Sequence, residues 1–254
     1  MTLPLNDQSM LESLRATLFQ SEFYLPPVFD FVAVSFFALT GALAAMRRGY
    51  DIIGLFAVAF VTGLGGALIR DGLFLQDGPP ALTRHWGYLA AVLSGCFVGW
   101  SVGSFLEKFR NALAVIDAIG LGAYSVVGVQ KSVAAGLSFP AAIFVGVTNA
   151  CGGGLLRDII TREEPLMLKP GQFYVLASLL GSGIFVSLIR HTELAAPAAA
   201  LIAMAVTFLF RMYAIVFNWR TVPVRPWLFR REEIPGTTDS AKSKPPKTDG
   251  PQVK

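Results

Sequence analysis

Two short segments of the chain combine a glycine cluster with an adjacent arginine–aspartate pair. The sequence reads LGGALIRD at residues 64–71 and CGGGLLRD at residues 151–158, and both segments lie in long apolar runs. Charges inside a bilayer face a partner or water and often mark ion or solute paths, and glycine costs about 1 kcal/mol relative to alanine inside a helix. Residues of these types in this pattern could line a route for small ions or solutes across a membrane.

The composition indicates an integral membrane protein. Of the 254 residues, 54% are hydrophobic and only 15% are charged, which is more apolar than a soluble chain of this size. Runs of about 20 apolar residues can cross a hydrocarbon core, and seven such runs predict an all-α fold of seven transmembrane helices. The predicted spans are residues 27–46, 51–71, 86–105, 113–133, 139–160, 172–190 and 196–217. The sequence offers no arrangement of nucleophile, base or metal ligands, so we expect neither an enzyme nor a metal site.

The first six spans form two related halves. A shift of 87 residues aligns, without a gap, Asp30 with Asp117, Gly41 with Gly128, Gly49 with Gly136, Thr62 with Asn149, Gly65 and Gly66 with Gly152 and Gly153, Arg70 with Arg157, and Asp71 with Asp158. Because each half has an odd number of spans, the second half enters the membrane from the opposite side, which predicts an inverted repeat. We expect three-helix repeats at residues 26–105 and 113–190 and a seventh helix at 196–217.

Basic residues are distributed unevenly between the two sides of the predicted membrane. The segments after spans one, three, five and seven contain Arg47, Arg48, Lys108, Arg110, Arg162, Lys169, Arg220, Arg225, Arg230 and Arg231. This bias predicts that these segments are cytoplasmic, that residues 1–25 are extracytoplasmic, and that residues 218–254 form a basic, disordered cytoplasmic tail. We expect membrane lipid as the surroundings of the chain, and no nucleic-acid partner.

The glycine clusters have two interpretations. They could interrupt the second and fifth helices near the membrane midplane, where freed carbonyl groups are tolerated only against protein or water, and hydroxyl and amide groups nearby could replace water around a monovalent cation. Close helix packing, as in small-xxx-small contacts, is the alternative. The favoured interpretation is a kink that lines a cavity, and the candidate pore residues are Gly65, Gly66, Gly152, Gly153, Gly154, Thr62, Thr148, Asn149, Ser35 and Ser125.

The charged residues of the spans predict two ion pairs. In the proposed topology, Asp30 and Arg70 lie at the outer side and can pair, and the duplication places Asp117 and Arg157 in the equivalent contact at the inner side. Structural ion pairs and a direct role in conduction both remain open for these four residues. Asp71 and Asp158 are then left as negative charges near the two pore mouths.

Lys131 breaks the symmetry of the repeat, because Ala44 occupies the equivalent position. It lies within about two turns of the predicted outer end of its helix, close enough for its ammonium group to snorkel to the interface. The alternative is a cation held in or beside the permeation path, where it would act as a gate.

The two GGxLxRD-like elements, the layout of three plus three plus one helices and the GVQK segment at residues 128–131 together resemble the prokaryotic branch of the TRIC family, the trimeric intracellular cation channels. The resemblance covers about residues 25–217. It implies a homotrimer in which each subunit has its own pore, formed chiefly by the first two helices of each repeat and permeable to potassium. Animal members have a Lys-Glu-Val segment where this chain has Gln130, Lys131 and Ser132. This difference from the animal members implies a bacterial or archaeal inner membrane rather than a reticulum.

Two functional classes therefore remain for the sequence. A channel would need a continuous polar path, whereas a secondary transporter of a small solute such as glycine would use broken helices to hold a carboxylate. The resemblance favours a potassium-permeable cation channel. The expected ligands are permeant potassium ions and bound lipid, with no other cofactor.

Overall fold

The computed structural model describes residues 23–106 except 77, 81, 82 and 84, residues 112–169, and residues 173–219 except 218. Most of the predicted extracytoplasmic N-terminal segment and nearly all of the predicted basic tail lie outside the described residues. The helices of the described part are α2 (Val28–Arg47), α3 (Ile52–Ile69), η1 (Arg70–Leu75), α5 (Gly87–Leu106), α6 (Ala112–Ala134), α7 (Phe139–Ile160), α8 (Tyr174–His191) and α9 (Ala196–Val216).

These helices have the length and composition of membrane spans. Six stretches of the described chain are long and apolar enough to cross a membrane, one of them formed by α3 together with the π-helical η1, and α5 contains a shorter apolar stretch at Gly87–Gly103. Local signals fix several helix starts. The Asp51 side chain caps α3 by accepting a hydrogen bond from the Gly54 amide at 2.8 Å, and Pro140 stands in the first turn of α7, where a missing N–H costs nothing.

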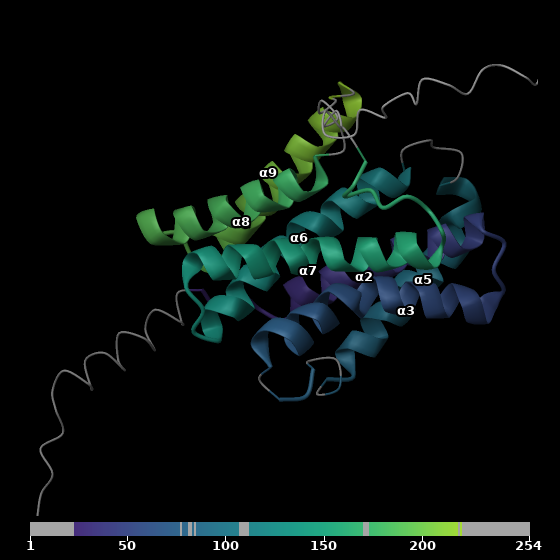
Figure 1. Ribbon diagram of the computed structural model, residues 1–254, viewed down its shortest axis with the longest axis horizontal. Helices are drawn as coiled ribbons and strands as arrows, with labels where there is room; N and C mark the ends of the chain where they lie inside the picture. The colour runs from purple at the N-terminus through teal and green to yellow at the C-terminus, as the bar shows by residue number, and fades with distance from the viewer. Residues whose placement is uncertain are drawn as a thin grey trace, which may run out of the picture. The chain divides into compact units, whose positions relative to one another are not determined.

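Each repeat packs its first helix against its second and third. In Figure 1, α2 lies with α3 and α5, and α6 lies with α7 and α8. The two repeats meet through the pairs α2–α6 and α3–α7, and α9 packs on α6 and α8. The centre of the protein is therefore built from the first two helices of each repeat.

Two equivalent turns carry the signature of the duplication. Gly49 follows α2 with a φ of 70°, and Gly136 follows α6 with a φ of 83°. Glycine adopts this left-handed conformation without the steric penalty that a Cβ atom imposes, which is why it commonly ends helices. The same residue therefore ends the first helix of both halves. The predicted fold class is confirmed: six membrane helices form an inverted repeat of two three-helix units, and a seventh helix follows them.

Candidate functional site

The two glycine clusters meet where α3 packs on α7. A Cβ atom added to Gly65 would lie 3.7 Å from the Cα of Gly153, and one added to Gly152 would lie 3.2 Å from the Cα of Gly66. Because position 65 corresponds to 152 and position 66 to 153, each contact is the symmetry equivalent of the other. The missing side chains let the two backbones approach this closely.

The same symmetry governs the neighbouring carbonyl groups. A Cβ atom on Gly66 would strike the carbonyl oxygen of Asn149, and one on Gly153 would strike that of Thr62. Both α3 and α7 continue as α-helices through their glycines. The prediction that the glycines interrupt these helices is therefore wrong. At Gly66 and Gly153, the backbone of the facing helix fills the space left by the absent side chain. Their role in a pore stays a prediction.

Thr62 and Asn149 occupy equivalent, fully buried positions beside this crossing. The Thr62 hydroxyl donates to the carbonyl of Val58 at 2.6 Å, and the Asn149 side-chain amide donates to the carbonyl of Tyr124 at 2.7 Å. Asn149 therefore ties α7 to α6, whereas Thr62 bonds within its own helix.

The predicted hydroxyl residues do not form one cluster. Ser35 lies between α2 and α5, where it donates to the carbonyl of Ala91 at 3.0 Å. Ser125 is buried on α6 and donates to the carbonyl of Gly122 at 2.8 Å. Thr148 is half-buried and bonds back to its own helix. Of the five predicted neutral ligands, only Thr62 and Asn149 are placed together at the crossing.

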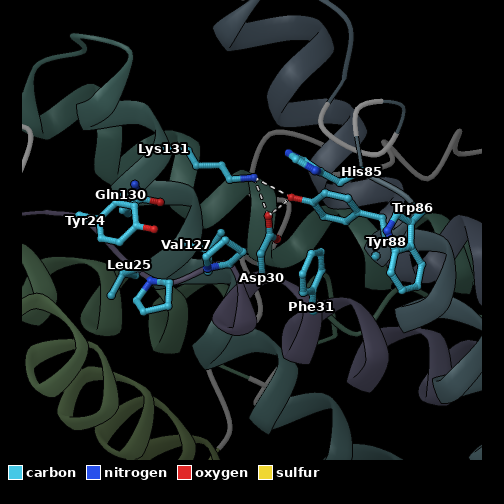
Figure 2. A pocket seen from close by; sticks show the side chains of 13 residues that line it. Tyr24, Leu25, Asp30, Phe31, His85, Trp86, Tyr88, Val127, Gln130 and Lys131 are labelled. Carbon is cyan, nitrogen blue, oxygen red and sulfur yellow. Dashed lines mark hydrogen bonds and ion pairs between the residues drawn. The ribbon is translucent and has the colours of Figure 1, made fainter.

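We call the region where α2 and α5 begin and α6 ends the Lys131 end (Figure 2). The Nζ atom of Lys131 lies 2.5 Å from Asp30 Oδ2 and 3.0 Å from the Tyr88 hydroxyl oxygen, and that hydroxyl donates to the same Asp30 oxygen at 2.5 Å. Asp30 is 3% exposed, but the Lys131 side chain is 25% exposed. Lys131 is therefore held by a carboxylate while part of its side chain remains accessible.

Arg70 makes different contacts from those predicted. Its Nε donates to Asp71 Oδ1 at 2.7 Å, and its Nη1 donates to the Asn149 side-chain oxygen at 3.3 Å. The predicted direct ion pair between Asp30 and Arg70 is not formed. Lys131 reaches across from α6 and binds Asp30 Oδ2, while Asp30 Oδ1 has no hydrogen-bond partner within the described part of the chain. Arg70 stays close enough for its charge to act on Asp30.

A cavity of about 550 Å³ opens onto the Lys131 end. Asp30 and Lys131 lie along its lining in Figure 2, and Tyr88 approaches them from the opposite side. Aromatic groups supply much of the remaining wall: Tyr24, Phe31, His85 and Trp86. The Asp30–Lys131–Tyr88 group therefore stands between this cavity and the interior of the protein.

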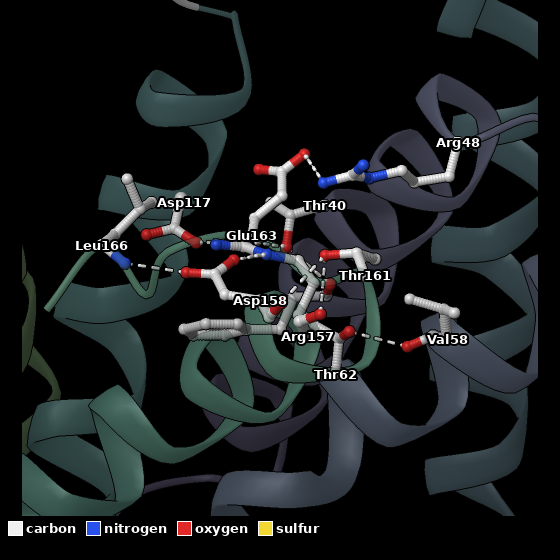
Figure 3. Close-up of polar contacts among 11 residues, drawn as sticks. Thr40, Arg48, Val58, Thr62, Asp117, Arg157, Asp158, Thr161, Glu163 and Leu166 are labelled. Atoms are coloured by element: carbon white, nitrogen blue, oxygen red, sulfur yellow. Dashed lines mark hydrogen bonds and ion pairs between the residues drawn. The ribbon is translucent and has the colours of Figure 1, made fainter. Parts of the chain in front are cut away.

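We call the region where α2 and α7 end and α6 begins the Arg157 end (Figure 3). Arg157 donates from Nη1 to Asp117 Oδ1 at 2.7 Å and to the Thr40 hydroxyl at 3.0 Å, and from Nε to Asp158 Oδ1 at 2.8 Å. The pair predicted between Asp117 and Arg157 is present, and both residues are 1% exposed. Charge pairs as deeply buried as this one leave a costly unpaired charge when one partner is removed.

The two aspartates that follow the arginines are not unpaired mouth charges. Asp71 and Asp158 each accept a hydrogen bond from the Nε of the preceding arginine, and Asp158 also accepts one from the Leu166 amide at 2.8 Å. Each carboxylate is therefore bonded to its neighbouring guanidinium, and the role of the two aspartates as negative charges near the pore mouths stays a prediction. Asp158 nevertheless lines a small cavity of about 160 Å³ with Arg157 and Arg47.

An aromatic pair lies between the two ends. Phe37 of α2 and Tyr124 of α6 stack with ring centroids 5.1 Å apart, and they are 87 positions apart, so each is the equivalent of the other. The Tyr124 hydroxyl donates to the carbonyl of Gly63 in α3. The stack therefore closes the centre of the protein around the symmetry axis of the repeat.

Three residues of this region escaped the sequence interpretation. Arg211 of α9 is fully buried and its guanidinium lies over the Tyr174 ring, 5.1 Å from the centroid; a charge within a predicted span was the signal that could have found it. Tyr88 and Tyr174 begin α5 and α8. Tyrosine is common at helix ends near a membrane interface, so nothing in the sequence indicated that Tyr88 and Tyr174 contact charged side chains.

Comparison with known proteins identifies relatives of this chain. The profile described as Glycine transporter matches the chain twice, over residues 27–103 and 114–191. A UPF0126 membrane protein of Deinococcus radiodurans is 32% identical over 77% of this chain and 90% of its own length, and the UPF0126 inner membrane protein YadS of Escherichia coli K12 is 29% identical over 73% and 89%.

Solved structures agree with these relatives. The TRIC trimeric intracellular cation channel orthologue from Rhodobacter sphaeroides has 31% sequence identity and a TM-score of 0.70, covering 75% of this chain and 97% of its own. The chain belongs to the TRIC family. A second solved TRIC cation channel, with 26% identity and a TM-score of 0.67, covers 80% of this chain and 98% of its own. The two profile matches begin 87 residues apart, the interval at which this TRIC protein repeats its Arg-Asp elements.

Proposed function

We propose that the protein is a monovalent cation channel with one permeation path in each subunit, gated at the Lys131 end. The observation that carries the proposal is the Asp30–Lys131–Tyr88 group, which stands at the wall of a cavity of about 550 Å³. The TRIC relatives with solved structures are described as cation channels, which supports the same class of function here.

The path proposed runs along α2 and α6. Asp30 and Lys131 line the cavity at one end of these helices, and Ala44 and Leu113 line the smaller cavity at the other. The Phe37–Tyr124 stack lies between them, packed against α3 through the Tyr124 hydroxyl. A cation that follows this path passes carboxylate oxygens at both ends and must displace the Lys131 ammonium and the aromatic stack.

Lys131 acts as the gate in this proposal. A fixed ammonium about 4 Å from a monovalent cation repels it by roughly 1 kcal/mol in bulk-like water and by several-fold more in a less polar constriction. While Lys131 is bound to Asp30 it also neutralises the carboxylate that would attract the cation. Movement of the partly exposed Lys131 side chain into the cavity would free Asp30 and open this end.

The remaining features of the proposal concern assembly and placement. We infer a homotrimer that conducts potassium, as the family resemblance implies, in a bacterial or archaeal inner membrane and among bound lipids. The basic segments after α2 and α7 support a cytoplasmic C-terminus, with the Lys131 end extracytoplasmic. A tag at residue 250 that can be labelled from outside intact cells would contradict this orientation.

Single-channel recording of the purified protein in a planar bilayer tests the function. Discrete potassium current steps are expected in the wild-type protein. Their absence together with slow, saturable uptake into proteoliposomes would identify a carrier instead. The control is Gly183→Ala, which places a methyl group in open space away from the proposed path and should conduct like the wild-type protein.

One observation favours transport of a small solute as the second candidate. The profile that matches both repeats is described as Glycine transporter, and the cavity at the Lys131 end contains one carboxylate and one ammonium, the complements of the two charges of glycine. Saturable uptake of labelled glycine that is lost in both Asp30→Asn and Lys131→Met would support this function.

A further inference from the structure

The Lys131 ammonium group lies among oxygen atoms that belong to two other helices. Its Nζ atom is 2.5 Å from Asp30 Oδ2 of α2 and 3.0 Å from the Tyr88 hydroxyl oxygen of α5. The second carboxylate oxygen, Asp30 Oδ1, is buried and has no hydrogen-bond partner within the described part of the chain. Oxygen ligands of this kind replace the water around a permeant cation. The position of Nζ therefore has the surroundings of a cation site.

The duplication does not supply this ammonium group. Ala44 is the equivalent of Lys131 in the first half, and Asp117, the equivalent of Asp30, is bound directly by Arg157. Lys131 thus takes a place beside Asp30 that is closed by an arginine at the other end of the protein.

The ammonium group has room to leave this position. Asp30, Tyr88 and Lys131 all line the cavity of about 550 Å³ (Figure 2), and the Lys131 side chain is 25% exposed. Lysine carries its charge on a long, flexible stem. Nζ can therefore move into the cavity while the two oxygen-bearing side chains stay where they are.

The charge balance of the Lys131 end selects the class of cation that could replace the ammonium group. Arg70 is bonded to Asp71, and Lys131 balances Asp30. When the ammonium group moves away, one monovalent cation restores the balance at Asp30. A divalent cation leaves a net positive charge close to the Arg70 guanidinium, which repels it.

We propose that the position of Lys131 Nζ is a binding site for one monovalent cation, held by Asp30 and Tyr88, and that Lys131 is a tethered competitor for this site. The inference rests on the proposed function, because it gives the permeant cation its first binding site in the path. A cation that binds only when the ammonium group has left shifts the population toward the displaced state as its concentration rises. Opening then depends on the identity of the cation as well as on ionic strength.

Amine labelling of the full chain in nanodiscs tests the competition. The protein is acetylated with sulfo-NHS acetate at fixed pH and ionic strength while potassium chloride replaces N-methylglucamine chloride, whose cation is too bulky for the site. An amine displaced from Asp30 reacts faster, so labelling of Lys131 should rise about threefold or more with potassium. Labelling of the half-buried Lys169 should not change. Potassium-independent labelling of Lys131 would overturn the proposal.

The choice of cation and the loss of the carboxylate give two further tests of the same labelling. Magnesium chloride at equal ionic strength should produce no such rise, and a rise equal to that with potassium would contradict a monovalent site. In Asp30→Asn, Lys131 should be labelled fast at every potassium concentration. A remaining dependence on potassium in this variant would place the site elsewhere.

The variant Lys131→Met removes the competitor and leaves the oxygen ligands. Potassium should then raise the melting temperature at a concentration about fivefold or more below that needed by the wild-type protein, since binding to the folded state stabilises it. Lys169→Met is the matched control and should need the wild-type concentration. An equal potassium requirement in Lys131→Met and the wild-type protein would contradict competition. If Asp30→Asn or Lys131→Met yields no assembled protein, labelling of the wild-type chain decides alone.

Labelling and current separate this site from the proposed channel. Potassium-dependent labelling of Lys131 in a protein that gives no current steps would keep the cation site and refute the channel. Current steps together with potassium-independent labelling would keep the channel and refute the site.

Discussion

The Lys131 end and the Arg157 end carry the same inherited charges but are completed by different residues. Each has an aspartate from the first helix of a repeat and an Arg-Asp pair from the second, and in each the arginine Nε holds the following aspartate. At the Arg157 end the guanidinium also binds Asp117 directly, whereas at the Lys131 end a lysine from the other repeat takes Asp30.

The two additional cations differ in how freely they can move. Lys131 is a flexible side chain, 25% exposed beside a cavity of about 550 Å³. Arg211, near Asp117, is fully buried over an aromatic ring, and the neighbouring cavity measures only about 160 Å³. We infer from this difference that the Arg157 end is a fixed structural cluster, whereas the Lys131 side chain at the other end has room to change its contacts.

The largest expected effect is the loss of the fixed cluster. Arg157→Gln leaves Asp117 and Asp158 buried without their common partner, and breaking a buried pair costs about 3–5 kcal/mol. We expect a large fall in melting temperature and in yield, measured by thermal unfolding of the purified protein. Asp117→Asn in the Arg157→Gln background should recover part of this loss, and a double variant as unstable as the sum of its single variants would contradict the pair.

The second prediction concerns the crossing of α3 and α7, where the equivalent glycines of the two repeats should respond alike to substitution. Gly66→Ala and Gly153→Ala each push a methyl group into a carbonyl of the facing helix, and overpacking of this kind costs about 1–3 kcal/mol. Both variants should lose stability and current together, with Gly183→Ala unaffected. Loss of current in a fully stable Gly153→Ala protein would instead restore the role of the glycines as a pore lining.

A smaller energetic difference separates the possible partners of Asp30. A double-mutant cycle between Asp30→Asn and Lys131→Met should give a coupling of about 1–2 kcal/mol, within the range for residues in contact. The cycle between Asp30→Asn and Arg70→Gln should give less, since those two residues are not directly paired. Equal coupling in the two cycles would show that Arg70 and Lys131 share Asp30.

The smallest expected effect is on current. Lys131→Met removes a repulsive ammonium, so unitary current or open probability should increase about twofold in low salt, and the gain should shrink in high salt as screening replaces the substitution. The yield of trimer should not change. Currents that match the wild-type protein at both salt concentrations would leave Lys131 with a structural role only.

Much of the fold could be predicted from the sequence, because the length of each apolar run and the 87-residue interval of the repeat can both be measured along the chain. The predicted span at residues 139–160 coincides with α7, and the shift of 87 residues anticipated the contact between Asp117 and Arg157. The glycines were interpreted as helix breaks because glycine both weakens a helix and lets two helices pack closely. The sequence pattern is the same for the two roles. Only the position of the facing backbone distinguishes the two roles.

The partner of Lys131 could not be predicted for a different reason. The glycine contacts between the two repeats occur twice, as the duplication leads one to expect. The contact of Lys131 with Asp30 occurs once, because the position equivalent to Lys131 in the first half is Ala44. Tyr88 and Arg211 likewise belong to helices whose faces could not be assigned from an apolar sequence. A contact between helices that occurs in only one half of the protein leaves no repeated pattern in the sequence from which it could be predicted.

The paired glycine contacts also have an evolutionary consequence. Contacts in which residue i meets j and the equivalent of j meets the equivalent of i are those of a twofold homodimer, and the contacts of Gly65 with Gly153 and of Gly66 with Gly152 have this form. An ancestral half could have formed them only by inserting into the membrane in both orientations and pairing with its own inverted copy. In such a dimer any lysine would appear at both ends, so the single Lys131 requires two halves that had already diverged in sequence.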